Sequence, residues 1–252
     1  MMKRDELVSY LQEYLVCDDF KDYAPNGLQV EGGSTIQKLC TAVTASQAII
    51  QKAVALQADA LLVHHGYFWR GETAMITGMK YKRISQLISH NINLLAYHLP
   101  LDCHPTIGNN ACLGKLFALE TIRMHPASNV PNLLWSGILS KSMSAKAFSV
   151  YIEKKLNRVP LHVSGINKPI HRIAWCTGAA EDYIEEASLL GVDAYLSGEI
   201  SERTYYQAKE LGIHYYACGH HATERFGVQA LGEHLSERYG LLHHFIDSEN
   251  PV

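Results

Sequence analysis

Two adjacent histidines are the residues of this chain whose type and position best suit metal chemistry. His64 and His65 follow the apolar run Leu61–Val63, which reads as the end of a buried strand. Neighbouring residues on a strand point to opposite faces, so the two imidazoles do not converge naturally on one ion. The tandem pair therefore suits two metal ions better than one.

Further polar groups follow other apolar segments. His98 and Asp102 come directly after the apolar run 92–97. His220 and Glu224 are spaced i, i+4, so they share one face if a helix starts there. A carboxylate such as that of Glu224 can bridge two cations with its two oxygens. Three histidines and two carboxylates would give each of two ions three protein ligands and leave positions for water and substrate. The residues from which such a set could be drawn are His64, His65, His98, Asp102, His220 and Glu224.

The remaining histidines are expected to be structural. His162, His171 and His214 stand alone in their segments, and a lone histidine at a strand end is usually a hydrogen-bonded core residue. His243 and His244 form a second tandem pair, but no other ligands lie beside it in the sequence, so we expect them to alternate between the faces of a strand. Mixed imidazole and carboxylate ligands leave the metal open among Zn, Mn, Fe, Co and Ni.

The six cysteines form no C-x-x-C pair, so the sequence indicates neither a zinc ribbon nor a disulfide framework. Cys40 and Cys176 lie in apolar strand-like segments and are expected to be packed core thiols. Cys103 and Cys218 stand close to candidate ligands, and we expect them to be buried thiols as well.

An internal repeat indicates how the chain positions these ligands. Residues 37–65 align without a gap with residues 171–199 at a constant offset of 134, and each copy reads as strand, helix, strand. The segment 92–98 is echoed by 213–219 at an offset of 121. The chain is therefore expected to contain two related α/β units whose strand ends collect the ligands, because ligands bind at strand ends in such sheets.

The hydrophobic periodicity gives the expected elements. We expect a first unit over 1–124, to which the segment 225–252 returns, a linker over 125–137 rich in proline and asparagine, and a second unit over 138–224. Strands are expected at 38–44, 59–64, 92–97, 171–177, 192–197, 213–218 and 241–247, and helices at 3–16, 46–57, 79–90, 180–190, 201–210 and 221–238. Asn109 and Asn110 are expected to cap a further helix that ends near Phe117.

Composition narrows the class of protein. The 252 residues are 47% hydrophobic and 19% charged, with a net charge of −3, which is typical of a globular, core-forming chain. There is no long basic stripe, so we expect no broad nucleic-acid-binding surface. There is also no apolar run of the roughly 20 residues that a membrane helix needs, and no signal-peptide core. We therefore expect a cytoplasmic protein with no membrane partner.

Three motifs together resemble one family. They are His64–Trp69 (HHGYFW), Tyr97–Asp102 (YHLPLD) and Gly219–Arg225 (GHHATER), supported by Ala24–Val30 (APNGLQV) and Phe245–Asp247 (FID). In this combination and order they resemble the GTP cyclohydrolase 1 type 2 homologues, also described as Nif-three-like dinuclear-metal proteins, in their short bacterial form.

The resemblance implies two α/β units packed around a dinuclear metal site at their interface, and six subunits in a toroid. It also implies a role for each ligand: His65 and Asp102 hold one metal, His64 and His220 hold the other, and Glu224 bridges them. His98 falls on a family histidine close to the metals, to which we assign proton transfer or support of the ligands.

The resemblance implies a metal-dependent hydrolase with a small nucleotide-like substrate, in which water attacks C8 of the guanine ring of GTP. Tyr67, Phe68 or Trp69 could stack on a purine, although aromatic residues after a strand are more often core. Four basic side chains could contact phosphate groups or could simply be exposed to solvent. The basic residues are Arg70, Lys80, Lys82 and Arg83.

Two alternatives stay open from the sequence. The same site could hydrolyse modified or damaged nucleotides in a DNA-damage response. A metal-loaded ring could also be a metal carrier or a protein-binding scaffold without enzymatic activity.

Overall fold

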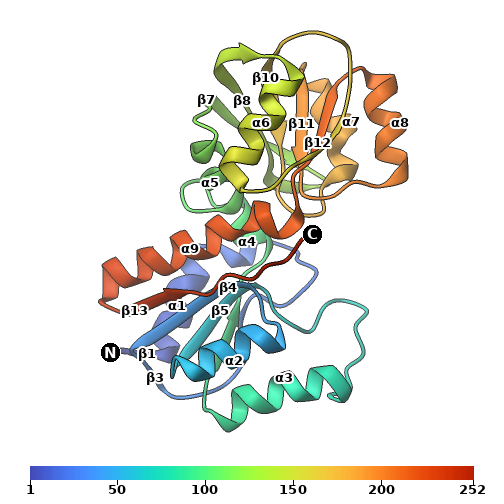
Figure 1. Cartoon of the computed structure of the whole chain (residues 1–252). Coiled ribbons are helices and arrows are strands. Elements are labelled where there is room, and N and C mark those ends of the chain that lie inside the picture. The colour runs from blue at the N-terminus through green and yellow to red at the C-terminus, as the bar shows by residue number, and fades with distance from the viewer. The chain divides into compact units, whose positions relative to one another are not determined.

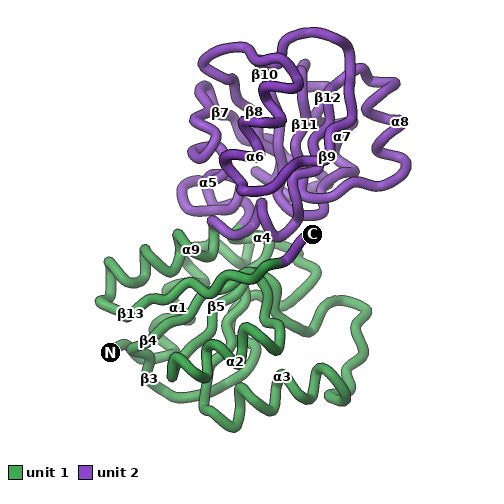
Figure 2. The backbone as a smooth tube through the Cα atoms, viewed as in Figure 1, with its two compact units in different colours: residues 1–101, 227–249 green, residues 102–226, 250–252 purple.

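The computed structural model describes all 252 residues, which form two compact units. Unit 1 consists of Met1–Leu101 and Gly227–Glu249, and unit 2 consists of Asp102–Phe226 and Asn250–Val252 (Figure 2). Each unit combines a sheet with helices, so the expected α/β class is confirmed (Figure 1).

Unit 1 is built on a five-stranded sheet in the order β13-β4-β5-β6-β2, with a small separate pair, β1-β3. Its strands are β1 (Met2–Lys3), β2 (Gly27–Val30), β3 (Thr35–Ile36), β4 (Lys38–Thr44), β5 (Ala60–His65), β6 (Asn93–Ala96) and β13 (Leu242–Phe245). Its helices are α1 (Arg4–Tyr14), the 3-10 turn η1 (Cys17–Asp19), α2 (Gln47–Ala55) and α3 (Gly78–Ser89). Two helices contain the unit boundary, α4 (Leu99–Cys103) and α9 (His220–Tyr239).

Alternating residues of β4 and β5 bury both faces of this sheet, as parallel strands require. Cys40 and Leu61 face α2 and α3, where they pack with Ile50 and Leu87 in one apolar cluster. On the other face, Thr41 bonds to the ring of His243. Helices α1 and α9 meet through the bond between Tyr10 and His234.

Unit 2 is built on a six-stranded sheet in the order β7-β8-β10-β11-β12-β9. Its strands are β7 (Glu120–Ala127), β8 (Val130–Met143), β9 (Leu161–Val163), β10 (Ile170–Trp175), β11 (Ala194–Ser197) and β12 (His214–Ala217). Its helices are α5 (Asn109–Leu116), α6 (Ala145–Leu156), η2 (Glu181–Tyr183), α7 (Ile184–Leu189) and α8 (Glu202–Leu211). One apolar cluster joins Phe148 and Ile152 of α6 to Ile173 and Trp175 of β10.

The register of the two sheets repeats at the same offsets as the sequence. In unit 1, Leu39 of β4 pairs in parallel with Ala60 of β5, and in unit 2 the residues 134 positions later, Ile173 and Ala194, are paired in the same way. β5 and β6 pair Ala60 with Asn93, and β11 and β12 pair Ala194 with His214. The repeated segments therefore share both their secondary structure and their strand register.

A repeated aspartate holds each register in place. Oδ2 of Asp59 accepts the backbone N–H groups of residues 37 and 38, at 2.9 and 2.8 Å. Oδ2 of Asp193 accepts those of residues 171 and 172 at the same two distances, and its Oδ1 lies 2.8 Å from Nζ of Lys168. Partial burial raises the pKa of Asp193, but hydrogen bonds to Lys168 and to the backbone outweigh it, so the net pKa is lowered.

The expectation of a linker over 125–137 is wrong. These residues lie in β7 and β8, which pair in antiparallel fashion and place Arg123 opposite Ser136. Ser128 and Asn129 join the strands with φ of 47° and 64°, the left-handed pair that a tight hairpin turn requires. Pro126 is tolerated because β7 is the edge strand of the sheet.

Two further expectations differ from the structure. The first unit does not extend to residue 124, because the division falls after Leu101, while Gly227–Glu249 lie in unit 1. Asn109 and Asn110 do not cap α5, whose N-cap is Gly108. Their side chains bind Asp102 instead. None of the helices is long and apolar enough to cross a membrane.

We expect the repeated aspartates to stabilise the fold equally in the two units. Asp59→Ala and Asp193→Ala each remove a charged acceptor from two backbone donors, so each should lower the free energy of unfolding by about 2 kcal/mol in urea titrations. The contribution of Asp193 should be present at neutral pH and be lost as the pH falls below the unfolded pKa and through the lower folded pKa. The exposed control Asp19→Ala should change stability by less than about 0.5 kcal/mol. A similarly small change for both variants would contradict this role.

Candidate metal centre

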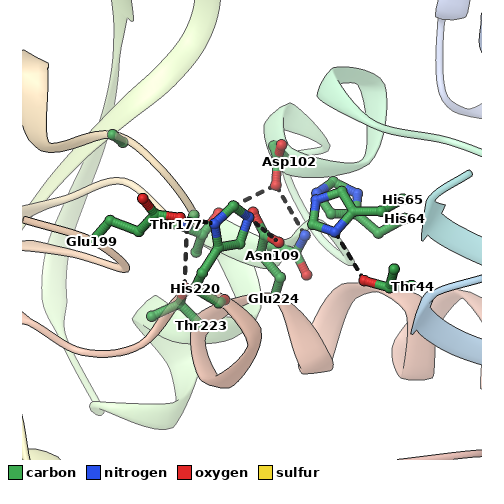
Figure 3. Close-up of polar contacts among 12 residues, drawn as sticks. Thr44, His64, His65, Asp102, Asn109, Thr177, Glu199, His220, Thr223 and Glu224 are labelled. Atoms are coloured by element: carbon green, nitrogen blue, oxygen red, sulfur yellow. Dashed lines mark hydrogen bonds and ion pairs between the residues drawn. The ribbon is translucent and has the colours of Figure 1, made fainter. Parts of the chain in front are cut away.

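The tandem histidines of unit 1 end strand β5, and both rings are held through Nδ1. Nδ1 of the fully buried His64 lies 2.9 Å from the carbonyl oxygen of Tyr97. Nδ1 of His65 lies 3.1 Å from the hydroxyl of Thr44, the residue it faces on β4 (Figure 3). A carbonyl oxygen only accepts, so Nδ1 of His64 carries the proton and Nε2 carries the lone pair that a metal would need.

His98 is held through Nδ1 by a carboxylate that sequence reasoning missed. Nδ1 lies 2.7 Å from Oδ1 of Asp22, whose side chain is 3% exposed. Oδ2 of Asp22 also accepts the N–H of Leu99, and the amide of Asn26 donates to Asp22 while its oxygen accepts the N–H of His98. Burial raises the pKa of Asp22, but the contacts with His98 and Asn26 lower it by more than burial raises it. The net pKa of Asp22 is therefore lowered. The carboxylate therefore stays ionised beside His98.

The three histidines form one cluster within unit 1. A set of ring nitrogens, one from each residue, lies within 4.8 Å of one another, close enough to hold a metal ion. The ring centroids of His64 and His65 are 4.6 Å apart, and that of His98 is 5.0 Å from His64. The tandem rings at the end of β5 therefore lie closer together than strict alternation predicts.

In unit 2, Asp102 is buried and orientated by uncharged donors. It is 5% exposed, and its Oδ1 accepts Nδ2 of Asn109 at 2.9 Å and the hydroxyl of Thr177 at 3.2 Å (Figure 3). Asn109 belongs to α5, and Thr177 follows the end of β10 by two residues. These two donors fix the orientation of the Asp102 carboxylate.

His220 and Glu224 occupy the first turn of α9 and face each other as their spacing predicts. Nε2 of His220 lies 3.0 Å from Oε2 of Glu224, and its Nδ1 lies 2.6 Å from Oε1 of Glu199 (Figure 3). Burial lowers the pKa of His220, but hydrogen bonds and charges of Glu224 and Glu199 outweigh it and raise the pKa to about 9. At neutral pH the ring therefore holds a proton between two carboxylates. A cation would compete with that proton for Nε2.

A glycine makes room for the Glu224 carboxylate. Gly178 has a φ of 70°, and a Cβ at this position would collide with Oε1 of Glu224. The N–H of Gly178 donates to the hydroxyl of Thr223, 3.1 Å away. The tight turn after β10 therefore has both a conformation and a close approach that only glycine permits.

Of the three aromatic residues after the tandem histidines, only Trp69 lies beside the rings without being buried. Its ring centroid is 5.0 Å from that of His98 and 5.9 Å from that of His65. Tyr67 is instead a core residue, with its hydroxyl bonded to the carbonyl of Ala45. Phe68 lies beneath the ammonium group of Lys80, 4.7 Å from its ring centroid.

The basic residues considered as phosphate contacts differ in their exposure and in their partners. Lys80 is buried and pairs with Glu72 while donating to the carbonyl of Thr73. Arg70 donates to the carbonyl of Asp22. Lys82 is exposed on α3.

The cysteines near the ligands are core thiols. Sγ of Cys218 donates to the carbonyl of Tyr216, and burial raises the pKa of this thiol. Cys103 is 3% exposed. Sequence reasoning also missed Glu199, the carboxylate that holds His220. Asp22 lies 76 residues from its partner, in a turn-rich segment that gave no signal of the contact.

Comparisons with known proteins point to one family. The family model described as Duf34/NIF3 (NGG1p interacting factor 3) matches residues 2–251. The chain is 51% identical over 247 residues to the GTP cyclohydrolase 1 type 2 homolog of Allochromatium vinosum, and the match covers 98% of this chain and 96% of that protein. It is 46% identical to the protein of the same name from Escherichia coli K12, with 100% of both chains covered.

Solved structures agree with this result. A structural-genomics protein, ybgI, described as of unknown function, has a TM-score of 0.94 and 46% identity, with full coverage of both chains. A protein from Thermus thermophilus has a TM-score of 0.90 at 33% identity, also with full coverage of both chains. Reduced HcgD from Methanocaldococcus jannaschii has a TM-score of 0.83 at 26% identity, covering 99% of this chain and 98% of that one.

We expect Asp22→Asn to release the ring of His98. The change replaces a charged acceptor with an amide that must present N–H groups to existing donors, which should lower the free energy of unfolding by about 1–3 kcal/mol. Long-range ¹⁵N spectra should show His98 losing the tautomer with the proton on Nδ1. The exposed control Asp18→Asn should leave the His98 signals unchanged. Retention of the original tautomer in Asp22→Asn would contradict the assignment.

Proposed function

The chain belongs to the Duf34/NIF3 family, and on this basis we propose that it is a metal-dependent hydrolase that acts on a nucleotide-like substrate with two divalent cations per chain. The observation that carries the proposal is shared by His64, His65, His98 and His220. In each of them Nδ1 contacts a protein oxygen, at 2.6–3.1 Å. Histidines that ligate metals are commonly held in this way through their second nitrogen, which fixes the ring and leaves Nε2 as the ligand atom.

The proposed centre has five protein ligands. His65 and Asp102 would hold one cation, His64 and His220 would hold the other, and Glu224 would be shared by both. The chemistry of these donors fits divalent transition metals, since three imidazoles and two carboxylates suit Zn, Mn, Fe, Co or Ni. Asp102 and Glu224 are both buried, and as carboxylates they would supply the negative charge that two cations need.

The protein groups have separate tasks in this proposal. Bound divalent cations would supply Lewis acidity and lower the pKa of water toward neutrality. His98 accepts and returns a proton at Nε2, and Asp22 stabilises the charged ring through Nδ1. The same arrangement of a carboxylate, an imidazole and a reacting proton is common in general acid–base catalysis.

The substrate part of the proposal rests on the names of the relatives and on Trp69. The relatives are named GTP cyclohydrolase 1 type 2 homologs. From this name we propose that the chain opens a purine ring by hydrolysis at C8. Trp69, beside His98 and His65, is the side chain we propose to stack on the purine. A cytoplasmic ring of six subunits, which the sequence resemblance implies, completes the proposal.

We expect purified protein to contain about two metal ions per chain by elemental analysis. Glu224→Ala should lose both ions, because it removes the one shared ligand, whereas His64→Ala should mainly weaken one site and retain about one ion. His244→Ala is the matched control, because His244 is the exposed member of a tandem pair outside the cluster. Equal metal loss in Glu224→Ala and His64→Ala would contradict the bridge.

We expect the metal-loaded protein to hydrolyse a nucleotide, and a panel that contains GTP and oxidised or alkylated purine nucleotides should identify it. His98→Gln should retain both metals but lower kcat by about 10²–10⁴-fold, the usual contribution of a general acid or base. Normal metal content with no turnover of any nucleotide would reject the hydrolase and favour the carrier or scaffold.

A further inference from the structure

A cavity with basic side chains lies in unit 2, away from the candidate metal ligands of that unit. Its volume is about 400 Å³, and it is open between β7, β8, the start of β10 and the segment that connects α7 to β11. Arg172, in its wall, belongs to the first residues of β10, whereas Thr177, which contacts Asp102, comes after the last. The cavity therefore lies at the start of β10, whereas the contact with the candidate metal ligand Asp102 lies beyond the end of that strand. The volume falls in the range of small-molecule sites.

The strand register places the basic side chains on one face of the sheet. Arg123 of β7 pairs with Ser136 of β8, and Arg172 of β10 pairs with Ile138, two residues further along β8. Paired residues and residues two apart share a face, so all four side chains point to the same side. His125 is two residues beyond Arg123, and its Nε2 bonds to the hydroxyl of Ser136 at 2.8 Å. Two guanidinium groups and an imidazole therefore converge on one hydroxyl-bearing wall.

No carboxylate lines this cavity, although the chain as a whole carries a net charge of −3. The guanidinium groups of Arg123 and Arg172 form no ion pair in the structure, and both side chains are exposed. Asp193, which accepts the backbone N–H groups of residues 171 and 172, forms its ion pair with Lys168. Partial burial and the charge of Arg123 lower the pKa of His125, as expected beside a cation. The lining itself therefore holds no carboxylate beside its two arginines, and Glu120 of β7, which pairs with Ile138, lies outside it.

His171 adds a buried polar atom that the fold does not use. Its side chain lines the cavity, and its Nδ1 is buried with no hydrogen-bond partner in the protein. A buried ring nitrogen without a partner costs stability and calls for an explanation. Apolar side chains of Ile138, Leu190 and Val192 also line the cavity, with Ile138 on the same face of the sheet as the arginines. The cavity thus combines cationic and hydrogen-bonding groups with apolar ones.

We propose that this cavity binds a small organic phosphate, with Arg123 and Arg172 on the phosphate group and the apolar side chains against the rest of the molecule. Guanidinium groups present paired N–H donors that match phosphate oxygens, and two of them offset the charge of a monoester dianion. Ser136 provides a further polar atom on the face of the arginines, and His171 also lines the cavity. The site is a second ligand site of unit 2, independent of the hydrolase proposal.

Calorimetric titration with adenosine 5′-monophosphate tests the proposal, with inorganic phosphate, adenosine and citrate as comparison ligands. Arg123→Gln and Arg172→Gln should each raise the Kd for the nucleotide about tenfold or more, because each removes a charge-assisted contact. Arg123→Lys and Arg172→Lys keep the charge without the fork and should lose less. The control Arg203→Gln removes the same charge from a surface outside the cavity and should stay within about twofold. Thermal unfolding checks that every variant is folded.

The comparison ligands separate the parts of the claim. The nucleotide should bind more tightly than inorganic phosphate, and adenosine should show no binding at the same concentrations. Equal binding by adenosine, tighter binding by citrate or by inorganic phosphate, or no binding of the nucleotide at millimolar concentration would overturn the proposal. So would unchanged affinity in both glutamine variants, which would place the nucleotide elsewhere on the chain.

Discussion

Parallel pairing of strands is the constraint on which the site in each unit depends. Parallel strands bring their carboxyl ends to one edge of the sheet, so polar residues that follow separate strands are gathered at that edge without any sequence proximity. In unit 1 this constraint brings together the histidines at the end of β5 and after β6, namely His64, His65 and His98. In unit 2 it places Thr177, Glu199 and His220 after β10, β11 and β12. The repeated aspartates fix the opposite ends of the same strands, where they hold the register.

The second determinant is the oxygen that holds each histidine through Nδ1. A neutral imidazole has one donor and one acceptor nitrogen, so a carbonyl or carboxylate at Nδ1 decides that Nε2 is the nucleophilic and ligating atom. The partners differ in charge: a carbonyl holds His64, a hydroxyl holds His65, and carboxylates hold His98 and His220. Histidines beside a carboxylate are the better proton carriers, which is consistent with separate roles for His64 and His98.

The central strands could be predicted well from the sequence. The prediction of a linker over 125–137 was wrong, because the proline and asparagine residues of a hairpin resemble those of a linker. The offsets of 134 and 121 reappear in the strand registers, because an apolar strand, an amphipathic helix and a second strand leave few other ways to pack. Pro126, Asn129 and Pro131 were interpreted as a linker, but an edge strand tolerates proline and a tight hairpin favours asparagine with positive φ. The contact of Asp22 with His98 could not be predicted, since it joins a loop to a strand end 76 residues away. The ligand types themselves were readable from the sequence, whereas their supporting oxygens were not.

The proposed dinuclear centre requires that five side chains hold two cations and share Glu224. Crystals of the metal-loaded protein, measured on both sides of the absorption edge of the bound metal, test it directly by anomalous scattering. We expect two anomalous peaks per chain, roughly 3.5–4 Å apart as in other two-metal sites, with a carboxylate oxygen of Glu224 on each and Nε2 of His64 and His65 on different peaks. A single peak, or two peaks of which neither contacts Glu224, would contradict it.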